Sequence, residues 1–207
     1  FTQRTITAVV PMTSRAKAGQ SLFEFTNDVV IPEALVTDGA GEFTGKNTGF
    51  IKAAWWMRIK LHMSEQGRKN QNHAAEREIG FLSKRWKLRM IKKKVPKRLW
   101  DFGLVYEAEL VSRMARGTDL RSGYEEVTGN TPDISEWLDF EFYDLVWWID
   151  RPNKPDVTDE TRQLARWLGV SHRVGSDMCY WLTTESGQIV SKTSVEHVTR
   201  DDNLQLG

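Results

Sequence analysis

The first part of the chain alternates between short apolar runs and longer amphipathic ones. Residues 5–11 are rich in β-branched side chains, alternate in polarity and end at a proline, which predicts a strand. Residues 16–29 place Leu22, Phe23 and Phe25 among polar positions and predict a helix. The apolar run at residues 31–38 then predicts a short buried strand that ends at Asp38.

The same alternation continues to residue 114. The pattern predicts a helix over residues 47–57, a strand over residues 59–63 and, after a polar loop at residues 66–72, a long helix from His73 to residue 95. The buried face of that long helix is expected to carry Ile79, Leu82, Trp86 and Met90, which recur three or four positions apart. A further helix over residues 97–114 is expected to bury Leu99, Trp100, Leu104, Ala108 and Val111. This order of elements indicates an α/β layer architecture.

The composition of the chain changes after residue 116. Residues 117–160 are rich in Gly, Ser, Thr, Asn, Pro and acids, apart from the apolar stretch 140–149, and they predict a linker. Residues 161–203 contain short runs of strand character with a turn at residues 185–187, and four or five such strands would form a small β-barrel. We therefore expect three parts, at residues 1–116, 117–160 and 161–203.

Charge is distributed unevenly between the two halves. Residues 1–120 hold 21 Lys and Arg against 12 Asp and Glu, whereas residues 121–207 hold 8 against 16. The basic half favours a polyanionic partner. Because no apolar run approaches the roughly 18 residues of a membrane-spanning helix, we expect a soluble, intracellular protein without a membrane partner. The single cysteine, Cys179, lies in an apolar run and is expected to be a core residue.

The strongest charge feature is a run of nine cations between residues 84 and 98 that contains no acid. Its members are Lys84, Arg85, Lys87, Arg89, Lys92, Lys93, Lys94, Lys97 and Arg98. We expect these side chains to stay unpaired within the chain and to face a phosphate backbone. A solvated helix face is the ordinary alternative, and residues 92–94 could also act as a nuclear import signal.

Two carboxylates stand where an α/β sheet commonly binds ligands. Asp38 is expected at the end of a strand and Glu76 in the first turn of the long helix, so a divalent cation bound through oxygen ligands is one interpretation. On pattern alone the stronger interpretation is ordinary: an acid beside glycines forms turns, and a glutamate early in a helix favours its dipole. No phosphate-binding glycine loop, nucleophile elbow or histidine metal spacing is present in the sequence.

Several motifs resemble the integrases of copia-type retrotransposons. The main ones are LVTDGAGEF at residues 35–43 and NQNHAAERE at residues 70–78. Weaker ones are VVPMTS at 9–14, RLWD at 98–101, TGNTP at 128–132, WLGVSH at 167–172 and residues 189–202. The resemblance implies an RNase H-like integrase core followed by a small SH3-like β-barrel. It also implies DNA integration through 3′-end processing and strand transfer, with two Mg²⁺ or Mn²⁺ ions.

The family arrangement assigns roles to particular residues. The resemblance implies that Asp38 bridges the metal ions, that Glu76 holds one of them, and that Lys84, Lys87 and their neighbours contact DNA phosphates. Asn70 and Asn72 would touch the DNA end. The family's first catalytic aspartate belongs on a strand upstream of residue 1, so the core is expected to be N-terminally incomplete and to supply two of three metal ligands. The family's zinc-binding N-terminal module is absent from these residues as well.

Three hypotheses therefore remain open. The chain is an integrase fragment that takes part in catalysis within a complete protein, or a DNA-binding remnant without catalysis. Alternatively it is an interaction protein that assembles through its acidic residues 121–160 and the Trp-rich residues 140–149. Metal dependence separates the first hypothesis from the second, and salt-dependent DNA affinity separates both from the third. A nuclear or cytoplasmic location fits each, and association into a homo-oligomer is left open.

Overall fold

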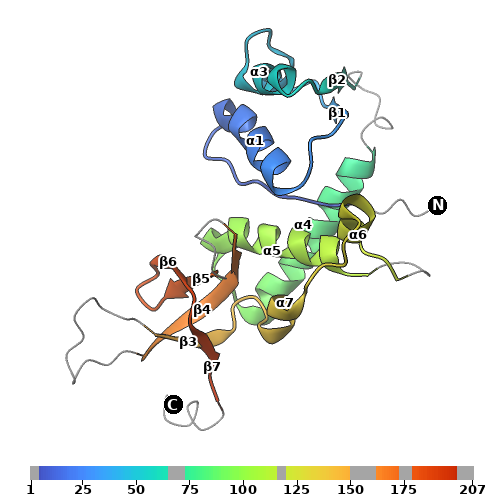
Figure 1. The fold of residues 1–207 in the computed structure, drawn as a ribbon. Helices are drawn as coiled ribbons and strands as arrows, with labels where there is room; N and C mark the ends of the chain where they lie inside the picture. Colours follow the sequence, from blue (N-terminus) through green and yellow to red (C-terminus); the bar gives the residue numbers. More distant parts are fainter. Residues whose placement is uncertain (1–4, 65–72, 116–119, 150–161, 173–178, 200–207) are drawn as a thin grey trace. The chain divides into compact units, whose positions relative to one another are not determined.

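The computed structural model describes the chain except for residues 1–4, 65–72, 116–119, 150–161, 173–178 and 200–207 (Figure 1). Two compact units are present. The first unit is Thr7–Lys87, and the second unit combines Phe1–Ile6 with Leu88–Gly207. The mixture of helices and sheets agrees with the expected α/β class.

The first unit is built on a pair of helices and a pair of strands. Its elements are η1 (Arg15–Lys17), α1 (Ala18–Asp28), β1 (Ala34–Thr37), α2 (Gly41–Thr44), α3 (Gly49–Trp56), β2 (Lys60–Met63) and the beginning of α4 (His73–Lys93). Strands β1 and β2 run parallel, with Ala34 opposite Lys60 and Thr37 opposite Met63. The predicted helices at residues 16–29 and 47–57 and the predicted strand at 59–63 are thus confirmed within a few residues.

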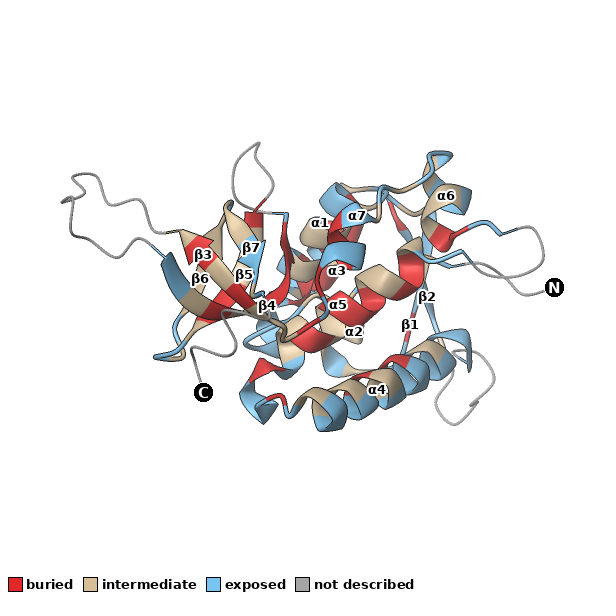
Figure 2. Cartoon of the chain, turned by 90° about the horizontal axis from the view of Figure 1, so that it is seen from below, coloured by how far each residue is buried: buried red, intermediate tan, exposed pale blue. Residues whose placement is uncertain are grey.

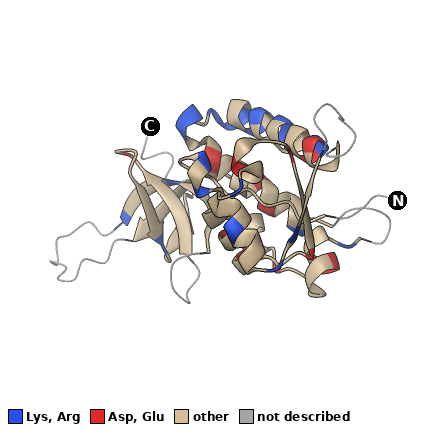
Figure 3. Cartoon of the chain, turned by 90° about the horizontal axis from the view of Figure 1, so that it is seen from above, with Lys and Arg blue, Asp and Glu red and all other residues tan. Residues whose placement is uncertain are grey.

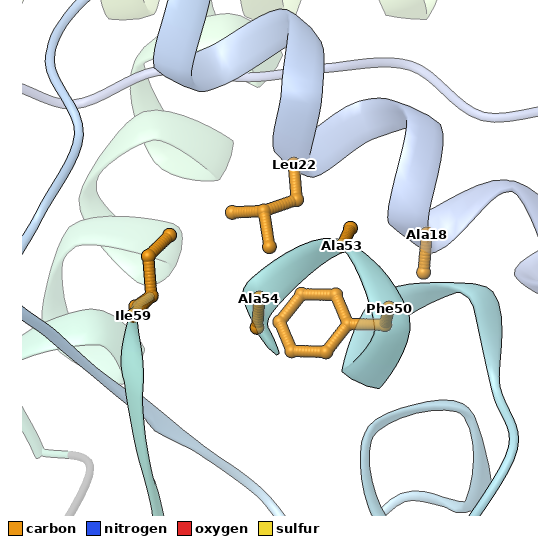
Figure 4. Close-up of a cluster of buried hydrophobic side chains, with 6 residues drawn as sticks. All are labelled: Ala18, Leu22, Phe50, Ala53, Ala54 and Ile59. Carbon is orange, nitrogen blue, oxygen red and sulfur yellow. The ribbon is translucent and has the colours of Figure 1, made fainter. Parts of the chain in front are cut away.

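The core of the first unit lies between α1 and α3 (Figure 4). Its buried side chains are Ala18, Leu22, Phe50, Ala53, Ala54 and Ile59. The two helices approach so closely at Gly19 that a Cβ atom there would lie 2.4 Å from the carbonyl oxygen of Gly49. Thr48 is the N-cap of α3, and its hydroxyl oxygen accepts a hydrogen bond from the backbone N–H of Ile51 in the first turn.

One predicted strand of the N-terminal segment does not form. The described residues 5–12 adopt neither strand nor helix, so the prediction of a strand at residues 5–11 is wrong. A β-branched run becomes a strand only when a neighbouring strand takes up its backbone hydrogen bonds. No strand within the described ranges pairs with this segment.

The second unit carries helices followed by one sheet. Its elements after α4 are η2 (Lys97–Leu99), α5 (Trp100–Arg113), α6 (Gly123–Thr128), α7 (Ser135–Asp139), β3 (Leu145–Ile149), β4 (Arg162–Ser171), β5 (Cys179–Thr184), β6 (Ile189–Lys192) and β7 (Val195–His197). The five strands pair antiparallel in the order β6-β5-β4-β3-β7, so the last strand returns beside the first. Strands β5 and β6 form the hairpin that the sequence predicts.

Aromatic side chains join α5 to this sheet. Tyr106 of α5 meets the fully buried Trp167 of β4 edge to face, and Phe102 meets Trp181 of β5 in the same way. Strand β4 carries a bulge between Trp167 and Gly169, and Gly169 has a φ of +124°, which only glycine adopts without strain. The bulge leaves the consecutive residues Trp167 and Leu168 both buried. Figure 2, coloured by burial, shows buried stretches along α5.

The observed division of the chain differs from the three expected parts. The boundary between the compact units falls between Lys87 and Leu88, inside α4. Helices α6 and α7 and strand β3 lie in the segment 117–160 that the sequence assigns to a linker. Strand β3 joins β4 to β7, so the sheet begins at Leu145 and not at residue 161.

Burial along the long helices corrects two details. Leu82 and Trp86 are buried as expected, but Ile79 is 64% exposed, so the buried face of α4 does not include it. Trp100 of α5 was expected to point inward but is 52% exposed. Leu99, which precedes it, is buried as expected, and so are Ala108 and Val111 of α5. Cys179 is buried, which confirms the prediction of a core cysteine. Among the described helices, none combines the length and apolar character that crossing a membrane requires.

Candidate nucleic-acid interface and carboxylate pair

Asp38 lies directly after β1, where the sequence places it. Its side chain is exposed, and its Oδ1 atom accepts a hydrogen bond of 3.3 Å from the backbone N–H of Ala40. This local bond turns the chain from β1 into α2. The second oxygen of the carboxylate is available for another ligand.

Glu76 lies in the first turn of α4 and is also exposed. It therefore belongs to the same compact unit as Asp38. Asn70 and Asn72, the predicted contacts to a DNA end, lie outside the described residues. Within the described ranges, no group of three or more His, Cys, Asp or Glu side chains is arranged to hold a metal ion.

Helix α4 presents cations on two different faces, and Figure 3 shows its Lys and Arg residues along its length. Lys84 and Lys87 are exposed and lie three positions apart, which places them on one side of the helix, and Lys94, directly after the end of α4, is exposed as well. Lys92 and Lys97 are exposed too. Across the part of the chain that the structure describes, none of these five lysines forms an ion pair. Arg85 packs its guanidinium over the ring of Phe81 at 5.6 Å.

The opposite face of α4 holds cations that are paired. Leu82 and Trp86 are buried on this face. Arg89 follows three positions after Trp86 and Lys93 four positions after Arg89, so the two cations continue the same face. Arg89 donates a hydrogen bond of 2.6 Å to Glu107, and Lys93 contacts Glu141 at 2.5 Å and Asp144 at 2.7 Å. The expectation that no cation of the run pairs within the chain is therefore wrong for Arg89 and Lys93.

Both paired cations belong to the second unit and so do their partners. Burial disfavours the charge of Lys93, but hydrogen bonds and attraction from Asp144 and Glu141 outweigh burial and raise its pKa. The hydrogen bond from Lys93 lowers the pKa of the Glu141 carboxyl, against a smaller opposing effect of burial. Lys93 and Glu141 therefore each favour their charged form.

These partner acids were not among the residues singled out in the sequence. Glu107, Glu141 and Asp144 lie 18, 48 and 51 positions from the cations that they bind, so no local charge pattern reveals them. A signal was present in the helix itself. Arg89 and Lys93 follow Leu82 and Trp86 on the inward face, and an inward cation requires a counter-ion.

Comparison with known proteins gives one informative result. No protein-family model matches the chain, and no curated protein matches it. A solved structure shares its fold. It is a chain of the cryo-EM structure of the simian T-cell lymphotropic virus intasome in complex with PP2A regulatory subunit B56 gamma. The TM-score is 0.50 at 12% sequence identity, over 91% of the present chain and 66% of that chain.

At this level of identity the likeness concerns the fold alone. It shows that the mixed arrangement of helices and sheets is similar to that of a chain in the intasome structure. The present chain also spans slightly less than two thirds of the chain that it matches.

Proposed function

We propose that this chain is part of a copia-type retrotransposon integrase and that it binds DNA through the exposed lysines of α4. The observation that carries the proposal is the fold likeness to a chain of a viral intasome, together with an acid-free lysine face on the helix that follows the integrase-like motif. Such a protein would act in the nucleus or the cytoplasm, and integrases commonly work as oligomers.

The two units are each consistent with a part of an integrase. Parallel strands β1 and β2, flanked by α1 and α3, are our candidate for part of an RNase H-like core. The antiparallel order β6-β5-β4-β3-β7, in which the last strand lies beside the first, is our candidate for an SH3-like barrel.

DNA is the partner that the charges favour. A lysine face releases counter-ions when it meets phosphates, and this release supplies most of the affinity for duplex DNA without regard to sequence. Lys84, Lys87, Lys92 and Lys94 are our candidates for phosphate contacts, because all four are exposed and form no ion pair within the described residues. Arg85 lies beside them on α4. Asn70 and Asn72 remain proposed contacts to the DNA end.

Catalysis would require Mg²⁺ or Mn²⁺. Asp38 and Glu76 are exposed carboxylates of the kind that bind these ions. The described residues, however, bring no third ligand to them, so they do not by themselves form a complete site. We therefore propose that the two carboxylates contribute to a metal site completed from outside the described residues, and we derive no catalytic step for this chain alone.

The incomplete ligand set favours a second candidate function, a DNA-binding remnant that has lost the chemistry. The two candidates differ in one measurable property. An integrase part would nick or join labelled DNA ends in the presence of Mn²⁺, and Glu76→Gln would abolish that activity. A remnant would bind the same DNA with the same affinity in both forms and would leave it uncut.

The experiment therefore measures Mn²⁺-dependent nicking and DNA binding on the same samples. Glu78→Gln serves as the control, because Glu78 stands two positions away on the same helix. Activity that disappears in Glu76→Gln but persists in Glu78→Gln would support a metal site. Binding without cleavage would support the remnant, and absence of binding would contradict both candidates.

A further inference from the structure

Three acidic side chains hold the inward cations of α4, and we call Glu107, Glu141 and Asp144 the acidic clamp. Glu107 Oε1 accepts a hydrogen bond from Arg89, and its side chain is only 1% exposed. Glu141 and Asp144 approach Lys93 together, and Glu141 also lies 3.7 Å from Arg89. Two cations thus share three carboxylates in an arrangement that satisfies both.

The acidic clamp is fixed by backbone hydrogen bonds. Asp144 Oδ2 accepts a hydrogen bond of 2.9 Å from the backbone N–H of Glu141. Tyr143 and Asp144 are tied to β4, because the Tyr143 N–H donates to the Trp167 carbonyl at 2.7 Å and the Trp167 N–H donates to the Asp144 carbonyl at 2.9 Å. Asp144 is therefore a preorganised counter-ion, and it loses little further conformational freedom when it pairs with Lys93.

The two lysines next to Lys93 in the sequence are not paired with carboxylates in the part of the chain that the structure describes. Lys92 and Lys94 are exposed, and within the described residues neither forms an ion pair. A phosphate would have to displace two carboxylates to reach Lys93, and it would then meet their uncompensated negative charges. Among the residues that the structure describes, no carboxylate pairs with Lys94 in this way.

We infer that the acidic clamp selects which cations at the end of the basic helix bind DNA: Lys92 and Lys94, the latter directly after α4, contact phosphates, whereas Arg89 and Lys93 are excluded and act as positioning residues. This inference rests on the proposed DNA binding. The inference goes further than that proposal, because the sequence of the basic run alone would assign a phosphate contact to every cation in it. Glu141 and Asp144 compete within the chain for the site that a phosphate would take on Lys93.

The test uses the salt dependence of binding to a short duplex of unrelated sequence. Each lost phosphate contact reduces the slope of log affinity against log salt by about one. Lys94→Met should therefore reduce the slope by about one, whereas Lys93→Met should leave it unchanged. The two variants differ by one position, at the last residue of α4 and the residue directly after it, and each removes one charge.

Release of the acidic clamp should reverse the behaviour of Lys93. In Glu141→Gln/Asp144→Asn the amide oxygens can still accept the backbone hydrogen bond at Asp144, but Lys93 has lost its ionic partners. The slope should steepen by about one in this double variant, and adding Lys93→Met should cancel that gain. Measuring the gain guards against confusion with misfolding, because a misfolded variant would lose affinity.

Two results would overturn the inference. One is equal loss of slope in Lys93→Met and Lys94→Met, and the other is a slope in Glu141→Gln/Asp144→Asn that does not respond to Lys93→Met. Failure of the proposed function is distinguishable from both, because the unmodified chain would then show no salt-dependent binding at all.

Discussion

Arg89 donates a hydrogen bond of 2.6 Å to Glu107, a residue on the following helix whose side chain is 1% exposed. The Arg89 guanidinium also lies over the ring of Tyr106 at 5.0 Å. Burial opposes the charge of Arg89, but the hydrogen bond and charge of Glu107 outweigh it and raise the pKa of the guanidinium. An ion pair therefore continues the apolar face of α4 into the interior of the second unit.

Removing the charge of Glu107 should destabilise the second unit. Glu107→Gln removes the nearer counter-ion of the largely buried Arg89 guanidinium and leaves, among the described residues, only Glu141 at 3.7 Å, and the expected cost is about 2 kcal/mol. Glu185→Gln, in the exposed β5–β6 turn, is the matched control and should change the stability little. Chemical denaturation followed by circular dichroism measures both. Equal midpoints for the two variants would contradict a structural role for this pair.

Two glycine substitutions should act in opposite directions. Alanine at Gly19 would place its Cβ 2.4 Å from the Gly49 carbonyl oxygen, and both atoms belong to packed helices, so Gly19→Ala should cost about 2 kcal/mol. Gly80 lies inside α4 with no atom within 4 Å of an added Cβ. Gly80→Ala should therefore stabilise the helix by about 0.5 kcal/mol. Thermal melting of both variants checks the difference, and a neutral Gly19→Ala would disprove the close helix contact.

The acidic clamp should make stability depend on acidic pH. The pKa of Glu141 is lowered in the folded chain, chiefly by its hydrogen bond from Lys93. Because the folded value lies below the unfolded one, its stabilisation is present above the unfolded pKa of about 4.3 and is lost as the pH falls through the folded pKa. Glu141→Gln should flatten the loss of melting temperature between about pH 5 and pH 3. Parallel curves for both proteins would exclude this contribution.

Removing the charge of Asp38 should affect metal-dependent activity without affecting folding. Its carboxylate is exposed and makes a single local hydrogen bond to Ala40, which the carbonyl oxygen of an asparagine can also accept. Asp38→Asn should therefore change stability by less than about 0.5 kcal/mol and leave DNA affinity intact, while abolishing any Mn²⁺-dependent nicking. Nicking that survives in this variant would remove Asp38 from the proposed metal site. A drop in melting temperature would assign it a structural role.

The succession of helices and strands in the first unit was readable from the sequence because apolar periodicity is a local property. The predicted helix at residues 16–29 and the strand at 59–63 correspond to α1 and β2. The strand predicted at residues 5–11 is wrong because strand formation depends on a partner that periodicity does not report. The place of β3 in the sheet depends in the same way on its pairing with both β4 and β7.

The candidate site shows the same limit. Asp38 and Glu76 stand at the strand end and helix start that the pattern predicts, and the structure leaves their metal-binding role as a proposal. The cation run was visible as a sequence feature, but its division into exposed and paired members was not. Lys93 and Asp144 are 51 positions apart, so their pairing is decided by tertiary packing. A triple reversal at residues 92–94 would therefore break internal ion pairs as well as any DNA contacts.

The central claim is that this chain binds DNA through exposed lysines on α4 and directly after it. Its most direct test is a salt titration of duplex binding by the unmodified chain and by Lys84→Glu/Lys87→Glu/Lys94→Glu. These three lysines are exposed, and none of them belongs to the ion pairs of the acidic clamp, so the variant should fold normally. We expect steep, linear salt dependence for the unmodified chain and a slope smaller by about three in the variant. Identical affinity and slope in the two proteins would contradict the claim.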